Sequence, residues 1–248
     1  MKRTWIPNAL TLGNLFFGCV ALVAASAQDI QGATLAIGIA LALDVLDGWA
    51  ARKLGVTGPL GAQLDSLADA VTFGVAPAFL LFHLWISPTL HPSLAQEDLS
   101  HGWQLWSKAV GIFVFSIALS SVYRLAKFTI DTRQKTSFIG LPTPANALWV
   151  LGYSWELTEG TLPVWAAHPL SLTLFIALSS YAMNAPWPLF AFKSFPKGWW
   201  GNRFRLLLAV LSAFFLAFYG MTAWLIVVPL YIVCSLLENR FHEVSRRD

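Results

Sequence analysis

The sequence predicts an all-α integral membrane protein, folded as a polytopic bundle of about eight transmembrane helices. Of the 248 residues, 56% are hydrophobic and only 12% are charged, and the mean hydropathy is +0.61. Soluble domains carry about 25% charged residues, so this composition excludes an ordinary soluble protein. Apolar runs close to the 20 residues that cross a bilayer recur along the whole chain. Because no long polar segment separates them, residues 1–248 are expected to form a single membrane domain.

The apolar runs define the helices in chain order. We expect helices at residues 8–27, 33–54, 62–87, 104–127, 143–158, 168–185, 203–219 and 222–239. The first run has no small-residue cleavage site after a short apolar core, so it is expected to remain a span rather than act as a signal peptide. Glycines and a proline between the second and third runs favour a short turn, which makes these two helices an antiparallel hairpin. Prolines interrupt the fifth and sixth runs, and the remaining three follow from apolar length alone.

The distribution of Lys and Arg predicts the orientation of the bundle, because basic residues flanking spans concentrate on the cytoplasmic side. With eight spans and a cytoplasmic N-terminus, all 16 Lys and Arg residues except Lys108 fall on that side. The opposite side carries acidic residues, namely Asp29, Glu97, Asp98, Glu156 and Glu159. Both termini are therefore expected in the cytoplasm. The basic pI of about 9.0 is explained by anchors near anionic headgroups, and nothing indicates a nucleic-acid surface.

Four aspartates lie inside two of the apolar runs, where a carboxylate is costly. Asp44 and Asp47 belong to the second run, and Asp65 and Asp69 belong to the third. Each opposes insertion near the bilayer centre by roughly 2.5 to 3.5 kcal/mol. Residues three, four, seven or eight positions apart share a helix face, so the carboxylates form one stripe on each helix. The predicted hairpin allows the two stripes to face each other.

Small residues and one guanidinium share these stripes: Gly48, Ala51 and Arg52 on the second helix, and Gly61 on the third. The small residues leave room for a flat base and its sugar. Four carboxylates at low dielectric cannot all stay ionised without cations, and hard oxygen ligands suit Mg²⁺ or a similar ion better than zinc. Two divalent ions would balance the charge and could clamp a diphosphate. Two other interpretations remain open, an ion or proton pathway and close helix packing on small residues.

The spacing of these residues carries a family resemblance. The run from Asp44 to Asp69 reads D-x2-D-G-x2-A-R-x8-G-x3-D-x3-D and resembles the signature of the CDP-alcohol phosphotransferase family at every position. The resemblance implies the fold of that family and a membrane enzyme that uses two divalent ions, Mg²⁺ or Mn²⁺, and releases CMP. It implies that Asp69 is both a metal ligand and the general base on the acceptor hydroxyl. The other implied metal ligands are Asp44, Asp47 and Asp65, the implied cytidine contacts are Gly48, Ala51 and Gly61, and Arg52 would pair with a carboxylate or phosphate.

Further segments resemble the bacterial serine-using branch of this family, the phosphatidylserine synthases. These segments are Pro7–Asn14, Gly61–Pro77, Tyr123–Phe128 and Phe138–Pro144. This resemblance implies CDP-diacylglycerol and L-serine as substrates, a homodimer, and an active site on the cytoplasmic face of the inner membrane. Other members of the family that use glycerol phosphate, inositol phosphate or choline remain the alternative.

Serine would need a cation for its carboxylate near the cytoplasmic end of the fourth span. Arg124 and Lys127 are the candidates, with Arg133 and Lys135 close by in the sequence. Both could equally be ordinary membrane anchors. Position 127 also departs from this branch, where Arg is expected, because Lys127 offers a point charge in place of a planar guanidinium group. Asn8 and Thr11 share a face of the first helix and are candidates for nucleotide contact, although capping of that helix explains them equally well. The extended segments 86–104 and 155–169 have no assigned function.

Overall fold

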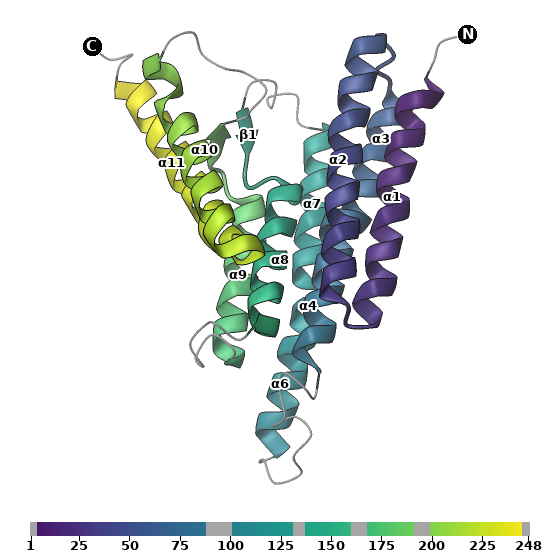
Figure 1. The fold of residues 1–248 in the computed structure, drawn as a ribbon, viewed down its shortest axis with the longest axis vertical. Helices are drawn as coiled ribbons and strands as arrows, with labels where there is room; N and C mark the ends of the chain where they lie inside the picture. The colour runs from purple at the N-terminus through teal and green to yellow at the C-terminus, as the bar shows by residue number, and fades with distance from the viewer. Residues whose placement is uncertain (1–3, 88–100, 131–136, 160–167, 191–198, 245–248) are drawn as a thin grey trace.

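The computed structural model describes residues 4–87, 101–130, 137–159, 168–190 and 199–244. All eight predicted helical segments are present in it (Figure 1). The helices of the N-terminal half are α1 (Trp5–Ser26), α2 (Ile30–Leu54), α3 (Pro59–Asp69), α4 (Ala76–Trp85), α6 (His101–Phe113) and α7 (Ser116–Ile130). Those of the C-terminal half are α8 (Thr143–Glu159), α9 (Pro169–Asn184), α10 (Trp199–Tyr219) and α11 (Trp224–Val244).

The helices form a bundle in which α1, α2 and α3 lie on one side and α10 and α11 on the other, with α8 between them (Figure 1). Helix α8 packs against α4, α9 and α11. One buried apolar cluster joins α1 and α2 to α4 and α8, and a second joins α4, α7, α8 and α9 to α11. These two clusters connect the helices of the described residues through α4 and α8.

Five helical stretches in the described residues are long and apolar enough to cross a membrane. The last of these, Asn202–Arg240, holds both α10 and α11. The chain reverses between them at a short 3-10 segment, η3 (Gly220–Ala223), where Gly220 has a φ of 55°, a conformation that glycine adopts without steric cost. Helix α8 has 17 residues, at the short end of the spanning range, and α9 has 16, just below it.

The hairpin of α2 and α3 has defined ends. Asp29 caps α2 by accepting a hydrogen bond of 2.9 Å from the backbone N–H of Gly32, which starts this helix three residues earlier than the sequence predicted. Helix α2 ends at Gly55, whose φ of 62° is left-handed. Pro59 then occupies the first turn of α3, where its missing N–H costs nothing.

The third span runs from Pro59 to Trp85 and is interrupted directly after Asp69 by a π-helical turn, η1 (Ala70–Val75). The sequence predicted one uninterrupted helix here. Two close contacts hold the turn. Thr72 packs on the backbone of Gly18 in α1, and a Cβ at Gly74 would lie only 2.9 Å from the Ser121 hydroxyl oxygen of α7. Turns of this kind occur frequently at functional sites.

The fourth predicted helix is divided into α6 and α7. Around residues 114–117, backbone N–H groups bond to the carbonyl three residues earlier, as in the bond of 3.2 Å from Val114 to Gly111 and that of 3.0 Å from Ile117 to Val114. This tighter winding breaks the regular α-helical ladder.

A two-stranded antiparallel ribbon, β1 (Ser137–Ile139) with β2 (Pro188–Phe190), was not predicted. The α11 side chains fix β2, because the Tyr231 hydroxyl donates to the Phe190 carbonyl at 2.9 Å and the Asn239 amide donates to the Pro188 carbonyl. The buried pair of Arg205 and Glu238, 2.9 Å apart, joins α10 to α11 beside it. Strands this short depend on tertiary partners that apolar periodicity does not reveal.

Both ends of the chain lie at the same end of the bundle (Figure 1). Basic residues of the described chain gather there, including Arg52 and Lys53 in the last turn of α2 and Lys127 in the last turn of α7. Lys108 lies in α6, towards the opposite end. These basic residues are therefore distributed unevenly along the bundle axis. Glu156 differs from the expectation, since only 1% of it is exposed and it lies inside the bundle.

Candidate functional site

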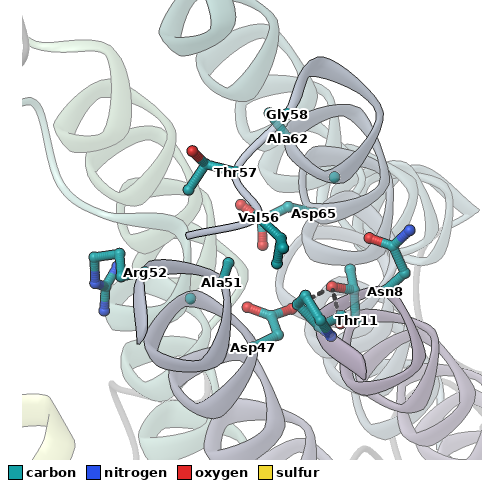
Figure 2. A pocket seen from close by; sticks show the side chains of 13 residues that line it. Asn8, Thr11, Asp47, Ala51, Arg52, Val56, Thr57, Gly58, Ala62 and Asp65 are labelled. Carbon is teal, nitrogen blue, oxygen red and sulfur yellow. Dashed lines mark hydrogen bonds between the residues drawn. The ribbon is translucent and has the colours of Figure 1, made fainter. Parts of the chain in front are cut away.

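A pocket of about 190 Å³ lies where α1, α2 and α3 meet, near the end of the bundle that holds the chain termini (Figures 1 and 2). Its walls come from three short stretches of sequence that the hairpin and α1 bring together. The lining residues are Pro7, Asn8, Thr11, Asp47, Gly48, Ala51, Arg52, Val56, Thr57, Gly58, Gly61, Ala62 and Asp65. Every residue that the sequence assigned to the nucleotide, from α1 and from the hairpin, is in this set.

Three carboxylates converge beside this pocket, and two of them, Asp47 and Asp65, line it. Asp44, Asp47 and Asp65 each offer an oxygen, and these oxygens lie within 4.8 Å of one another. We call these three residues the acidic group. Asp47 is buried, and Asp44 and Asp65 are half-buried. The helical period places Asp44 and Asp47 on one face of α2, and the short α2–α3 turn brings Asp65 opposite to them. The two stripes predicted from sequence therefore do face each other.

The acidic group has the chemistry of a site for a hard divalent cation. Carboxylate oxygens are the ligands that Mg²⁺ and Mn²⁺ prefer, and Mg²⁺ usually combines one or two carboxylates with substrate phosphates and water. Three carboxylates beside a pocket with space for phosphate oxygens fit that requirement. No His or Cys takes part in this group, which is the reverse of a zinc site.

Helix α1 supplies polar contacts to two of the four aspartates, one on α2 and one on α3. The Thr11 hydroxyl hydrogen-bonds the Asp47 carboxylate and also lies 3.0 Å from the Pro7 carbonyl oxygen (Figure 2). Asp69 is not part of the acidic group. It lies one turn further along α3, only 8% of it is exposed, and it accepts a hydrogen bond of 3.2 Å from the Asn14 amide. Thr11 is therefore bound to a metal-ligand candidate and not only to its own helix.

Sequence reasoning gave Asn14 no role, although it ends the Pro7–Asn14 segment. Asn14 is fully buried, and its backbone carbonyl also accepts a bond of 3.2 Å from Thr72 in the π turn. A signal was present in the sequence, because Pro7, Thr11, Asn14 and Gly18 are spaced four, three and four residues apart. This is the buried face of α1, and two of its four members are polar.

The small residues lie where the sequence predicted open space. Gly61 has ordinary room, since an added Cβ would lie 3.6 Å from the Asn8 side-chain oxygen. At Gly48 an added Cβ would lie 3.2 Å from the Arg52 guanidinium, which folds back along α2. Arg52 is exposed and lies further from the centre of the pocket than Asp47 does (Figure 2).

Val56 and Thr57, in the α2–α3 turn, were missed as pocket residues. They enter the wall because the left-handed Gly55 turns the chain back over the pocket (Figure 2). Their side chains carry no motif, so only the fold places them.

A second, narrow space of about 10 Å³ lies beside α7. It is lined by Arg124, Lys127, Phe128, Ile139, Met183 and Asn184. Arg124 is buried, with 8% of it exposed, and Lys127 is exposed. Helix α7 packs against α3 and against the π turn that follows Asp69, so this space lies on a neighbour of the aspartate-bearing helix. Arg133 and Lys135 lie outside the described residues.

Comparison with known proteins gives a consistent result over most of the chain. Residues 4–177 match the sequence profile of a family described as CDP-alcohol phosphatidyltransferase. Three similar proteins are each named CDP-diacylglycerol–serine O-phosphatidyltransferase. The protein of Bacillus subtilis is 35% identical over 56% of this chain and 70% of its own length. That of Mycobacterium leprae is 32% identical over 59% of this chain and 45% of its own length, and that of Methanocaldococcus jannaschii is 34% identical over 61% of each.

Proposed function

Because this chain belongs to the CDP-alcohol phosphatidyltransferase family, we propose that it transfers the phosphatidyl group of CDP-diacylglycerol to the hydroxyl of L-serine, with release of CMP. The observation that carries this proposal is the meeting of the acidic group with a pocket of about 190 Å³ built from α1 and the α2–α3 hairpin. The names of three relatives at 32 to 35% identity support serine as the acceptor.

In this proposal the CDP moiety occupies the larger pocket. Gly48, Ala51 and Gly61 leave the helix backbones accessible to the cytidine, while Asn8 at the rim offers polar contacts to it. Arg52, near the mouth, would pair with a phosphate or carboxylate. The lipid tails would extend into the bilayer.

Asp44, Asp47 and Asp65 would hold the divalent ions, with Asp69 as a further ligand. Mg²⁺ or Mn²⁺ bound there would neutralise charge on the diphosphate and on the departing CMP. The role of Thr11 is to fix the Asp47 carboxylate, because its hydroxyl bonds one of the two oxygens and limits rotation of the side chain.

Asp69 would accept the proton of the acceptor hydroxyl. The acceptor oxygen forms a bond to the phosphorus that carries diacylglycerol, and the bond from that phosphorus to the CMP oxygen breaks. Asn14 donates to Oδ1 of Asp69, which leaves Oδ2 for the incoming proton. CMP leaves with its phosphate charge, and phosphatidylserine remains in the membrane.

We also propose that the enzyme is a homodimer in a bacterial or archaeal cytoplasmic membrane, with the pocket and both termini on the cytoplasmic side. The basic residues at the pocket end of the described bundle support this orientation. Labelling of single cysteines from either side of sealed vesicles tests the orientation, and mass measurement in nanodiscs tests the dimer.

The experiment that tests the proposed reaction is CMP release by the purified protein. CDP-diacylglycerol is offered with L-serine, glycerol 3-phosphate, inositol phosphate or choline, each with Mg²⁺ or Mn²⁺ and after EDTA treatment. We expect CMP release when L-serine is the acceptor and none with the other three acceptors. EDTA should abolish this release, and either metal should restore it. CMP with a different acceptor would refute serine but keep the family reaction. Absence of CMP with every acceptor, in protein that retains its fold, would refute both.

A further inference from the structure

We propose that the π turn η1 is a positioning element for Asp69, held in place from opposite sides by Gly18 of α1 and Ser121 of α7. This inference rests on the proposed function, since it takes Asp69 as the base of that reaction. Neither Gly18 nor Ser121 lines the pocket or belongs to the acidic group. Both would therefore act on the reaction only through the turn.

The helix that carries Asp69 has few buried residues of its own. Of the 11 residues of α3, Ala68 and Asp69 are the buried ones. Helix α4, on the other side of the turn, is firmly anchored, because Leu80 belongs to one buried apolar cluster and Leu81 to the other. The direction in which Asp69 points therefore depends on its link to α4, which is the π turn, and on its bond to Asn14.

The π turn sets the rotation of α3 relative to α4. Such a turn holds about one residue more than an α-helical turn, and one residue corresponds to about 100° of rotation about the helix axis. If residues 59–85 formed an uninterrupted α-helix with α4 in its present place, Asp69 would be turned about 100° away from Asn14. The hydrogen bond of 3.2 Å between them would then be lost. The turn thus allows α4 to fill the core while Asp69 faces α1.

Two neighbouring helices hold this turn. Thr72 and Gly74 are two positions apart, so they point to nearly opposite sides of the helix. On one side Thr72 packs on Gly18, where an added Cβ would lie 3.1 Å from the Thr72 Cα, and its hydroxyl donates to the Asn14 carbonyl at 3.2 Å. On the other side, an added Cβ at Gly74 would lie 2.9 Å from the hydroxyl oxygen of Ser121 and 3.0 Å from its Cβ. The turn therefore has no free space towards α1 or α7.

Ser121 acts through its shape. It is fully buried, and its Oγ has no hydrogen-bond partner among the described residues. A buried hydroxyl without a partner is costly, so stability alone would favour alanine at this position. The hydroxyl instead fills the space beside Gly74 and prevents the turn from shifting towards α7.

The size of the expected effect follows from this contact. In Gly74→Ala the new Cβ and that of Ser121 would be 3.0 Å apart, about 0.5 Å closer than the van der Waals separation of about 3.5 Å. The turn must move by roughly that distance, and Asp69 moves with it. A misplacement of about 1 Å can cost about a hundredfold in rate, so half of that displacement is expected to cost about tenfold.

The test measures CMP release by the full-length protein with CDP-diacylglycerol, Mg²⁺ and L-serine or whichever acceptor supports release. We expect Gly74→Ala to lower kcat about tenfold and to leave both KM values within twofold. The rise in melting temperature on adding Mg²⁺ should be kept, since the acidic group lies on α2 and earlier in α3. A raised KM for CDP-diacylglycerol with an unchanged kcat would overturn the proposal.

The matched control is Gly111→Ala, which crowds the far end of α4. An added Cβ there would lie 3.2 Å from Trp85 and 3.3 Å from Ile86. We expect it to lower the melting temperature and to keep kcat within twofold of the wild type. If Gly74→Ala and Gly111→Ala slow the reaction equally, the contact with Ser121 contributes only packing and the proposal is wrong.

Removal of the opposing side chain should relieve the effect. The fall in kcat caused by Gly74→Ala is compared in the wild-type and Ser121→Gly backgrounds, and we expect about tenfold in the first and less than threefold in the second. An equal fall in both backgrounds would refute the role of Ser121. If Gly74→Ala does not fold, the double variant Gly74→Ala/Ser121→Ala removes the hydroxyl but keeps the Cβ. Its kcat should lie between those of the wild type and Asp69→Asn, and a wild-type kcat would overturn the proposal.

Gly18→Ala tests the contact on the side of α1. It presses on Thr72 from the opposite direction and should also lower kcat about tenfold with both KM values kept, whereas Thr72→Val keeps the shape of the side chain and should not move the turn. An unchanged kcat in Gly18→Ala would refute the role of Gly18. A wild-type protein that releases no CMP with any acceptor would instead refute the proposed function itself.

Discussion

The contact between Asn14 and Asp69 makes a sharp prediction about the transfer step. We expect Asn14→Leu to lower kcat about tenfold, with the KM values for both substrates within twofold of the wild type. Asn14 is fully buried, its Nδ2 lies 3.2 Å from Oδ1 of Asp69, and its own Oδ1 has no hydrogen-bond partner among the described residues. Leucine has nearly the same size, so the substitution removes one described side-chain bond and leaves the packing similar.

The magnitude follows from the geometry of this bond. Hydrogen bonds to charged groups contribute about 1.5 to 3 kcal/mol, and 3.2 Å is at the long end of the N–H···O range. The lower value therefore applies, and about 1.4 kcal/mol corresponds to a factor of ten in rate. The assay is CMP release at saturating substrate and metal concentrations, with a thermal unfolding curve for each variant.

The matched control for Asn14 is Thr72→Val. Thr72 donates to the backbone carbonyl of Asn14 at 3.2 Å and lies in the same buried layer, but this bond does not reach Asp69. We expect its kcat to stay within threefold of the wild type. If Asn14→Leu slows the reaction no more than Thr72→Val does, while Asp69→Asn is inactive, then Asn14 does not position the base.

Four further outcomes are expected. Asp69→Asn should reduce CMP release by at least a thousandfold while CDP-diacylglycerol still binds, because an amide cannot accept the hydroxyl proton; near-normal turnover would exclude it as the base. Gly61→Ala should raise the KM for CDP-diacylglycerol without lowering the melting temperature, since the added Cβ meets only an ordinary contact. The control Gly38→Ala, whose Cβ faces open space, should change neither the KM nor the melting temperature. Glu238→Ala should cost about 3 kcal/mol of stability by removing the carboxylate that pairs with the buried Arg205, and an unchanged melting temperature would contradict this. Mg²⁺ or Mn²⁺ should raise the melting temperature of the wild type, and this increase should shrink when one member of the acidic group is changed to Asn.

The parts of this molecule that sequence predicts well depend on local periodicity. The eight helical segments follow from apolar length, and Asp44 and Asp47 share a face because their separation of three residues is close to one helical turn. The hairpin follows from turn chemistry at Gly55 and Pro59. These features need no knowledge of which helices are neighbours.

The features that sequence did not predict depend on contacts between distant segments. The π turn after Asp69 is packed on Gly18, 54 positions before Thr72, and on Ser121, 47 positions after Gly74. Asn14 meets Asp69 across 55 residues, and the ribbon joins residues near 138 to residues near 189. Each depends on the packing of α1, α7 or α11, and no pattern inside a single segment encodes that packing.

The electrostatics of the acidic group require a source of positive charge at the site. Two unit charges 4.8 Å apart repel by about 3.5 kcal/mol at an effective dielectric constant of 20. Three ionised carboxylates therefore oppose folding by roughly 10 kcal/mol, which is comparable to the whole stability of a typical domain. The hydroxyl of Thr11, which α1 contributes to Asp47, offsets only a small part of this repulsion. The remainder must be offset by bound cations or protons, so a divalent ion that binds the acidic group is expected to stabilise the fold.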